Sequence, residues 1–90
     1  MYVQEEGEQM PTILRVYGYR FHFYAYDCRE PRHVHVEKGE AEAKFWLDPV
    51  TLASNHGFTT RQLQEIERLI REHYAALVKG WDDFCNRFTP

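Results

Sequence analysis

Hydrophobic and polar positions alternate through the first half of the chain, in runs rich in β-branched and aromatic residues. The runs are "TILRVY", "RFHFYAY", "HVHVEK" and "AEAKFWL", with Gly18 and Tyr19 between the first two and Gly39 and Glu40 between the last two. A strand projects alternate side chains to opposite faces, and short breaks that contain glycine favour hairpin turns. The pattern therefore predicts four strands, most of them antiparallel.

The hairpin expected at Gly39 and Glu40 has a definite register. Its predicted pairs are Glu37 with Glu42, Val36 with Ala43, His35 with Lys44, Val34 with Phe45 and His33 with Trp46. One face of the sheet then carries the apolar side chains of a core, namely Phe21, Phe23, Ala25, Val34, Val36, Ala43, Phe45 and Leu47. A slip of one residue would exchange the two faces, so the apolar pattern determines the register.

Helical signals follow the last of these strands. Asp48 before Pro49 is typical of a helix start and Gly57 of a helix end, which together predict a short helix. Thr59 and Gln62 have the spacing of a capping box. Behind them apolar residues recur every three or four positions, at Leu63, Ile66, Ile70, Tyr74, Leu77, Trp81, Phe84 and Phe88. The expected fold is α+β: a four-stranded, mostly antiparallel sheet, a short helix, and one long helix packed on one sheet face.

The expected long helix is longer than the sheet it covers. From Leu63 to Phe88 it would span about 39 Å, whereas strands of six or seven residues cross about 20 Å. The overhanging end would expose Trp81, Phe84 and Phe88, which predicts a homodimer or a heteromer through this segment. The alternative is that Gly80 breaks the helix and folds these aromatics back onto their own sheet.

Composition adds a domain boundary and a compartment. Ninety residues with 43% hydrophobic content supply one core. Residues 1–9 contain Glu5, Glu6 and Glu8 without Lys or Arg, so we expect a disordered acidic tail at 1–9 and a single α+β domain at 10–90. The chain has neither a membrane-spanning stretch nor a signal peptide, which favours a cytoplasmic protein whose Cys28 and Cys85 are free thiols.

Charge leaves binding to nucleic acid open. The formal net charge is −3, and the three glutamates of the tail account for all of it, since −3 − (−3) = 0. A neutral domain lacks an overall field that attracts phosphate, but it can still carry a local basic patch.

The sheet face opposite the core has an unusual composition. It collects polar and aromatic side chains, namely His22, Tyr24, Tyr26, His33, His35, Glu37, Glu42, Lys44 and Trp46. Such a set suits acid–base cleavage of RNA, in which a neutral histidine takes the 2′-hydroxyl proton and cations stabilise the phosphate. We assign the catalytic roles to His33, His35, Glu37 and Lys44, with Glu37 orienting a histidine, and substrate binding to Arg20, Tyr24, Tyr26 and Trp46, whose rings can stack bases.

Two other interpretations of this face remain open. His33, His35 and Glu37 could hold a divalent metal. A fourth ligand is evident only in His22 or Glu42, so we predict no metal and no cofactor. The aromatics could instead cover the interface of a non-catalytic protein-binding module. His56 and His73 are isolated in the sequence and receive no role.

Several motifs resemble a known bacterial family, the domain of unknown function 4160. They are "MPTILRVYGYRFHFYAYD", "EPRHVHVEKGEAEAKFWL", "PVTLASNHGFTTRQLQEIERLI" and a late Trp81. The resemblance implies a small cytoplasmic protein encoded beside another short protein, as in toxin–antitoxin modules, and hence a partner from the neighbouring gene. Arg32 and His22 depart from the family pattern, whereas His33, His35 and Lys44 fit it. We therefore expect a toxin-like component acting on RNA, with an antitoxin-side or binding role as the alternative.

Overall fold

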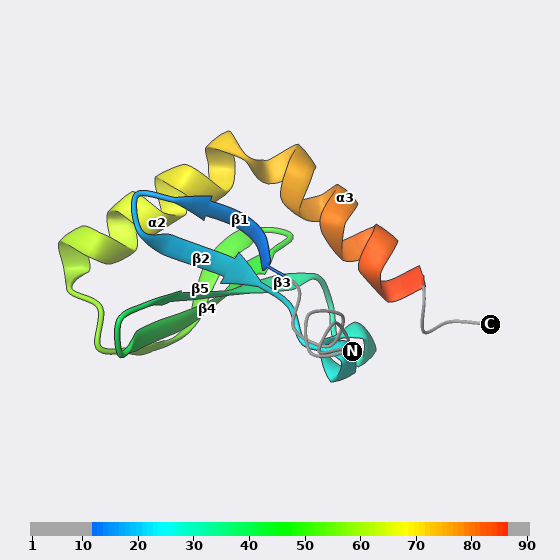
Figure 1. Ribbon diagram of the computed structural model, residues 1–90, viewed down its shortest axis with the longest axis horizontal. Coiled ribbons are helices and arrows are strands. Elements are labelled where there is room, and N and C mark those ends of the chain that lie inside the picture. The colour runs from blue at the N-terminus through cyan, green and yellow to red at the C-terminus, as the bar shows by residue number, and fades with distance from the viewer. Residues whose placement is uncertain (1–11, 87–90) are drawn as a thin grey trace, which may run out of the picture.

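The computed structural model describes residues 12–86, which form an antiparallel sheet followed by two helices (Figure 1). Residues 1–9, expected to form a tail, and Phe88 lie outside this range. The elements in chain order are β1 (Thr12–Val16), β2 (Tyr19–His22), the 3₁₀ helix η1 (Ala25–Arg29), β3 (His33–Lys38), β4 (Ala41–Leu47), β5 (Val50–His56), α2 (Thr60–Glu72) and α3 (Tyr74–Cys85). The α+β class predicted from the sequence is confirmed.

Each strand of the sheet pairs with its neighbours in sequence, in the order β1-β2-β3-β4-β5. The predicted register of the β3–β4 hairpin is confirmed, with His35 opposite Lys44 and His33 opposite Trp46. The first turn lies one residue earlier than expected, because Tyr17 and Gly18 both have positive φ, 53° and 84°. Tyr19 therefore belongs to β2 and is buried in the core.

The prediction of a short helix after Asp48 is wrong, because that segment forms a fifth strand. Asp48 and Pro49 make the tight turn between β4 and β5, and β5 pairs antiparallel with β4 from Leu47–Val50 to Glu42–His56. Asp-Pro is common at turns as well as at helix starts, and the β-branched residues Val50 and Thr51 favour a strand. The sheet gains an edge strand, and its open face gains the side chains of β5.

The prediction of a single long helix is also wrong, because the chain forms α2 and α3 with a break at His73. His73 has φ −109° and ψ 22°, outside the helical range, although its N–H still donates to the carbonyl of Leu69. The expected capping box at the start of α2 is present, with Gln62 N 3.1 Å from Thr59 Oγ1 and Thr59 N 2.9 Å from Gln62 Oε1. Figure 1 shows the two helices bent into an arch over the sheet. Within residues 12–86, no helix has the length and apolar character needed to cross a membrane.

The bend returns the C-terminal aromatics to the core, so they do not overhang. Trp81 is 6% exposed and Phe84 5% exposed, and both rings pack against Phe23. Gly80 does not break α3. It is the site of a close approach, because a Cβ atom at Gly80 would lie 3.0 Å from Cγ2 of Ile13 on β1. The exposed cluster from which we expected dimerisation is therefore absent from the described residues.

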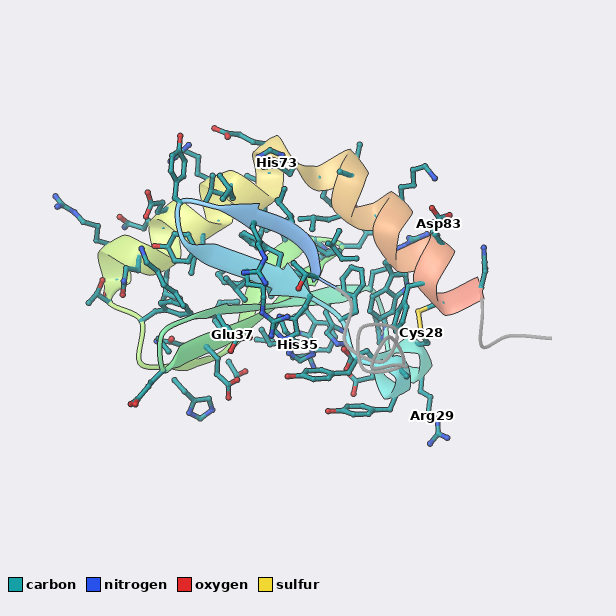
Figure 2. The ribbon with its side chains drawn as sticks, viewed as in Figure 1. Cys28, Arg29, His35, Glu37, His73 and Asp83 are labelled. Carbon is teal, nitrogen blue, oxygen red and sulfur yellow. A yellow bond between two sulfur atoms is a disulfide. The ribbon has the colours of Figure 1, made fainter. Side chains whose placement is uncertain are left out.

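A disulfide joins η1 to the end of α3, where free thiols had been expected. Cys28 and Cys85 are bonded with a Cα–Cα distance of 5.5 Å, and Figure 2 shows the sulfur atoms between η1 and the end of α3. Their separation of 57 residues hides the pairing from the sequence. Nearby, the guanidinium of Arg32 forms a bidentate pair with Asp82, at 2.9 and 3.0 Å from its two oxygens. The disulfide holds α3 against η1, and the ion pair holds it against the start of β3.

Candidate active site

Asp27 is the central group of the open sheet face, and η1 delivers it there. The turn of η1 is closed by the N–H of Asp27 donating to the carbonyl of Tyr24 and by the N–H of Glu30 donating to the carbonyl of Asp27, at 3.0 and 2.9 Å. The carboxylate in turn accepts the backbone N–H of Tyr24 at 2.8 Å. Asp27 is only 3% exposed, so its charge requires partners within the protein.

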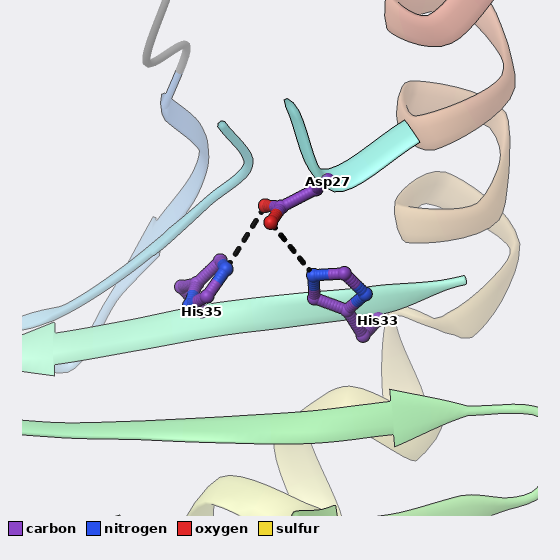
Figure 3. A group of neighbouring side chains, drawn as sticks. All are labelled: Asp27, His33 and His35. Atoms are coloured by element: carbon purple, nitrogen blue, oxygen red, sulfur yellow. Dashed lines mark hydrogen bonds and ion pairs between the residues drawn. The ribbon is translucent and has the colours of Figure 1, made fainter. Parts of the chain in front are cut away.

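Those partners are His33 and His35, which point toward Asp27 from the same face of β3 (Figure 3). His35 Nε2 lies 2.9 Å from Asp27 Oδ2, and His33 Nε2 lies 3.1 Å from Oδ1. Burial alone would raise the pKa of Asp27, but the two imidazoles and the N–H of Tyr24 outweigh it and lower this pKa well below its usual range. The carboxylate is therefore ionised at neutral pH; it holds His35 by a hydrogen bond, and its other oxygen faces His33 Nε2.

The ring of His35 has a defined proton arrangement in this contact. A carboxylate only accepts hydrogen bonds, so the Nε2–H of His35 donates to Asp27. Neutral His35 then keeps the lone pair on Nδ1. An aspartate that orients an imidazole in this way is the arrangement found in acid–base catalytic pairs.

His33 lies deeper than the alternating pattern suggests. It is fully buried although it shares the open face with His35, because Trp46 and Trp81 pack edge-on against its ring at centroid distances of 5.6 and 5.0 Å. His22 is likewise buried, and burial together with the charge of Arg20 lowers its pKa to about 4. Because both side chains are buried, neither His22 nor His33 can contact a macromolecule at the surface.

A cleft of about 270 Å³ opens beside His35. Its walls come from η1 and the residue before it and from β3, β4 and β5. They are Tyr24, Tyr26, His35, Glu42, Ala43, Lys44, Ser54 and His56. The rings of Tyr24 and Tyr26 stack with their planes parallel and their centroids 5.5 Å apart. The structure thus brings four of the predicted site residues, Tyr24, Tyr26, His35 and Lys44, to one depression.

The other predicted residues have different partners. Glu37 forms an ion pair with Arg20, and the carboxylate that contacts His33 and His35 is that of Asp27. Figure 2 shows His35 and Glu37 on the side of the sheet away from α2 and α3. Trp46 lies next to the cleft, beneath the ammonium of Lys44 at 4.5 Å from the ring centroid.

Lys44 also contacts a carboxylate. Its Nζ atom lies 2.8 Å from Glu30 Oε1, and the ammonium lowers the pKa of Glu30. Lys44 is 23% exposed, so a phosphate entering the cleft would meet this ammonium at the wall.

Sequence reasoning missed two residues of this site. Asp27 lies in a segment without periodicity, and its one signal is its position at the end of "MPTILRVYGYRFHFYAYD", the first motif of the family resemblance. From the sequence, His56 is expected next to Gly57 at the end of a short helix, isolated from the other site residues. The pairing of Glu42 with His56 in the β4–β5 ladder brings it to the cleft.

The fold and the site together define a small α+β domain, in which a five-stranded meander presents a buried aspartate–histidine cluster beside an open cleft. The chain belongs to the family described as a domain of unknown function (DUF4160), whose model matches residues 18–82. This match confirms the resemblance drawn from the sequence motifs. Neither a curated protein nor a solved structure matches the chain significantly.

Proposed function

We propose that the protein is a toxin-like component of a two-gene module and cleaves single-stranded RNA in the cleft beside His35. The observation that carries this proposal is the pair formed by buried Asp27 and half-buried His35 at 2.9 Å, with His35 lining the cleft. The pair supplies an oriented imidazole at a surface large enough for a nucleotide. The lysine and stacked tyrosines of the same cleft supply the two chemistries that hold RNA.

In the proposed reaction, His35 is the general base. Its Nδ1 atom takes the proton of a 2′-hydroxyl, and the 2′-oxygen forms a bond to the adjacent phosphorus. The bond from phosphorus to the 5′-oxygen breaks, which leaves a 2′,3′-cyclic phosphate and a 5′-hydroxyl. The leaving oxygen takes its proton from protonated His56 across the cleft, and the ammonium of Lys44 stabilises the charge on the phosphate.

Asp27 and His33 act as positioning residues in this scheme. Asp27 holds the Nε2–H of His35 and so keeps the lone pair on Nδ1. His33 is fully buried and cannot touch RNA, so we assign it a role through Asp27 rather than the direct catalytic role expected from the sequence. Glu37 and Arg20 form an ion pair at the margin of the site, and Arg20 can contact a neighbouring phosphate.

The proposed setting is the cytoplasm, where RNA is accessible; because that compartment is reducing, the protein would have to act there with the Cys28–Cys85 bond open for part of the time. The partner is the small protein encoded beside this one, bound as a heteromer that covers the cleft. Tyr26 is 67% exposed and its stacked pair with Tyr24 forms the wall of the cleft, so a bound partner would bury both rings and block RNA at once.

The proposal is tested with the untagged full chain and a single-stranded RNA that carries fluorophore and quencher. Wild-type protein should cleave it, and an oligonucleotide with one 2′-deoxynucleotide should resist cleavage at that position because the nucleophile is missing. His35→Ala and Lys44→Ala should lower the rate at least 100-fold. Lys44→Ala should melt near wild type, whereas His35→Ala removes a partner of the buried Asp27 carboxylate and should melt lower, so circular dichroism must show that it is folded at the assay temperature. Lys79→Ala, which removes an exposed lysine on α3, is the matched control and should cleave normally.

The same variants decide the question in cells. Expression of the wild type alone should arrest growth, co-expression of the neighbouring protein should relieve the arrest, and His35→Ala should be harmless. If wild-type protein cuts no RNA and His35→Ala behaves like it in cells, the catalytic proposal fails. Copurification with the neighbouring protein in that case would establish the alternative, a non-catalytic binding module.

A further inference from the structure

Both ring nitrogens of His33 face oxygen atoms that accept hydrogen bonds. Nδ1 lies 2.9 Å from the carbonyl oxygen of Pro31, which can only accept, so Nδ1 carries a proton. In neutral His33 the lone pair is then on Nε2, and Nε2 lies 3.1 Å from Asp27 Oδ1, another acceptor. The contact lacks the alignment of a hydrogen bond, and Nε2 has no hydrogen-bond partner among the described residues. A cation between Nε2 and Oδ1 would satisfy both atoms.

The surrounding donors suit a metal ion at this point. Asp27, His33 and His35 each offer one ligand atom, and the three atoms lie within 4.8 Å of one another. Asp27 and His33 are more than nine-tenths buried, and the hydrogen bond from His33 Nδ1 to a backbone carbonyl is the outer contact that metal-ligating histidines commonly make. We propose that Asp27, His33 and His35 form a binding site for a divalent first-row transition-metal ion.

The distances are compatible with such an ion after a small closure. Ligand atoms about 2.05 Å from a tetrahedral metal are roughly 3.3 Å apart. Each imidazole nitrogen is near that distance from a different oxygen of Asp27, with His33 Nε2 3.1 Å from Oδ1 and His35 Nε2 2.9 Å from Oδ2. The widest separation is at most 4.8 Å, so a rotation of the half-buried His35 ring has to shorten it by no more than about 1.5 Å.

The ligand types determine which ion fits. Two imidazoles and one carboxylate suit zinc, cobalt, nickel or iron in the divalent state, whereas magnesium and calcium prefer oxygen ligands. The three protein ligands leave a fourth position for water. His35 places that position on the side of the cleft, because it is the one ligand of the three that lines it.

Metal binding and the proposed RNA cleavage exclude each other at His35. In the metal-free site the proton is on Nε2 and the lone pair on Nδ1. The metal takes the Nε2 lone pair, so the proton moves to Nδ1 and the ring can no longer act as a base. This consequence rests on the proposed function, whereas the binding itself rests only on the three donors.

The binding test uses the untagged full chain and needs no RNA. Calorimetric titration with Zn²⁺ should give one site per chain, and Co²⁺ should give visible d–d absorption that Zn²⁺ displaces. Asp27→Asn and His35→Ala should each weaken Zn²⁺ binding at least tenfold, in line with the loss of one ligand. His56→Ala is the matched control, a histidine of the same cleft outside the cluster, and should bind as wild type. Mg²⁺ should give no heat of binding at the same concentrations.

The outcomes separate this inference from the proposed function. The inference is overturned if the wild type binds no Zn²⁺ or Co²⁺, or if Asp27→Asn and His35→Ala bind as tightly as His56→Ala. Binding by a protein that cleaves no RNA sustains the inference and removes the proposed function. If both hold, one equivalent of Zn²⁺ should suppress cleavage and a chelator should restore it.

Discussion

Removing the disulfide between Cys28 and Cys85 should lower stability by an amount that follows from its span. The bond closes a loop with a sequence separation of 57 residues. Closing a loop of that size removes roughly 14 cal/mol/K of entropy from the unfolded chain, which corresponds to about 4 kcal/mol at 25 °C. Because a chain of this length is stabilised by only about 5–15 kcal/mol in total, the reduced protein should fold marginally.

Urea denaturation of the wild type with and without a reductant measures this difference. With an m-value of about 1.5 kcal/mol/M, a loss of 4 kcal/mol moves the midpoint down by roughly 2.7 M. Cys85→Ser should unfold at the midpoint of the reduced wild type, and reductant should not change it further. A wild-type midpoint that does not respond to reductant, in protein shown by mass spectrometry to carry the bond, would falsify the loop-closure reasoning.

Two further predictions concern packing and pH. Trp81→Ala should lower the free energy of unfolding by about 3–5 kcal/mol, because it leaves a cavity against Phe23 and His33. Light scattering should show a destabilised monomer rather than a dissociated dimer. His22 has a folded-state pKa of about 4, below the usual value of 6.5, so the unfolded chain binds more protons between these pH values. Stability should therefore fall as the pH drops from 6.5 to 4, by up to about 1.4 kcal/mol per unit, and urea midpoints of His22→Gln should lack this component; an unchanged slope would contradict the assignment.

The register of the central hairpin could be predicted because alternation leaves one solution. Val34 and Val36 must face the core, and this places His33 and His35 on the other side. The errors arose where a signal has two physical meanings. Asp48 with Pro49 fits a turn as well as a helix start, and the apolar stripe keeps its spacing across His73, so its period cannot reveal that the helix bends there.

The candidate site was predictable only in the part that strands determine. Lys44 and His35 are neighbours because β3 and β4 pair, and pairing follows from the pattern. Asp27 reaches them through a turn of 3₁₀ helix, and Trp81 covers His33 from a helix 48 positions later. Contacts of this kind depend on how elements pack, which a periodicity in the chain does not encode.

The order of elements along the chain has a consequence for synthesis. All five strands precede the helices that cover them, so the apolar face of the sheet leaves the ribosome first. At about 5–20 residues per second, the 29 residues from His56 to Cys85 take roughly 1.5–6 s to add. During that interval Phe21, Val36 and Phe45 have no helix to pack against. The nascent chain therefore passes through a stage in which a chaperone or a neighbouring nascent chain competes with α2 and α3 for the same surface.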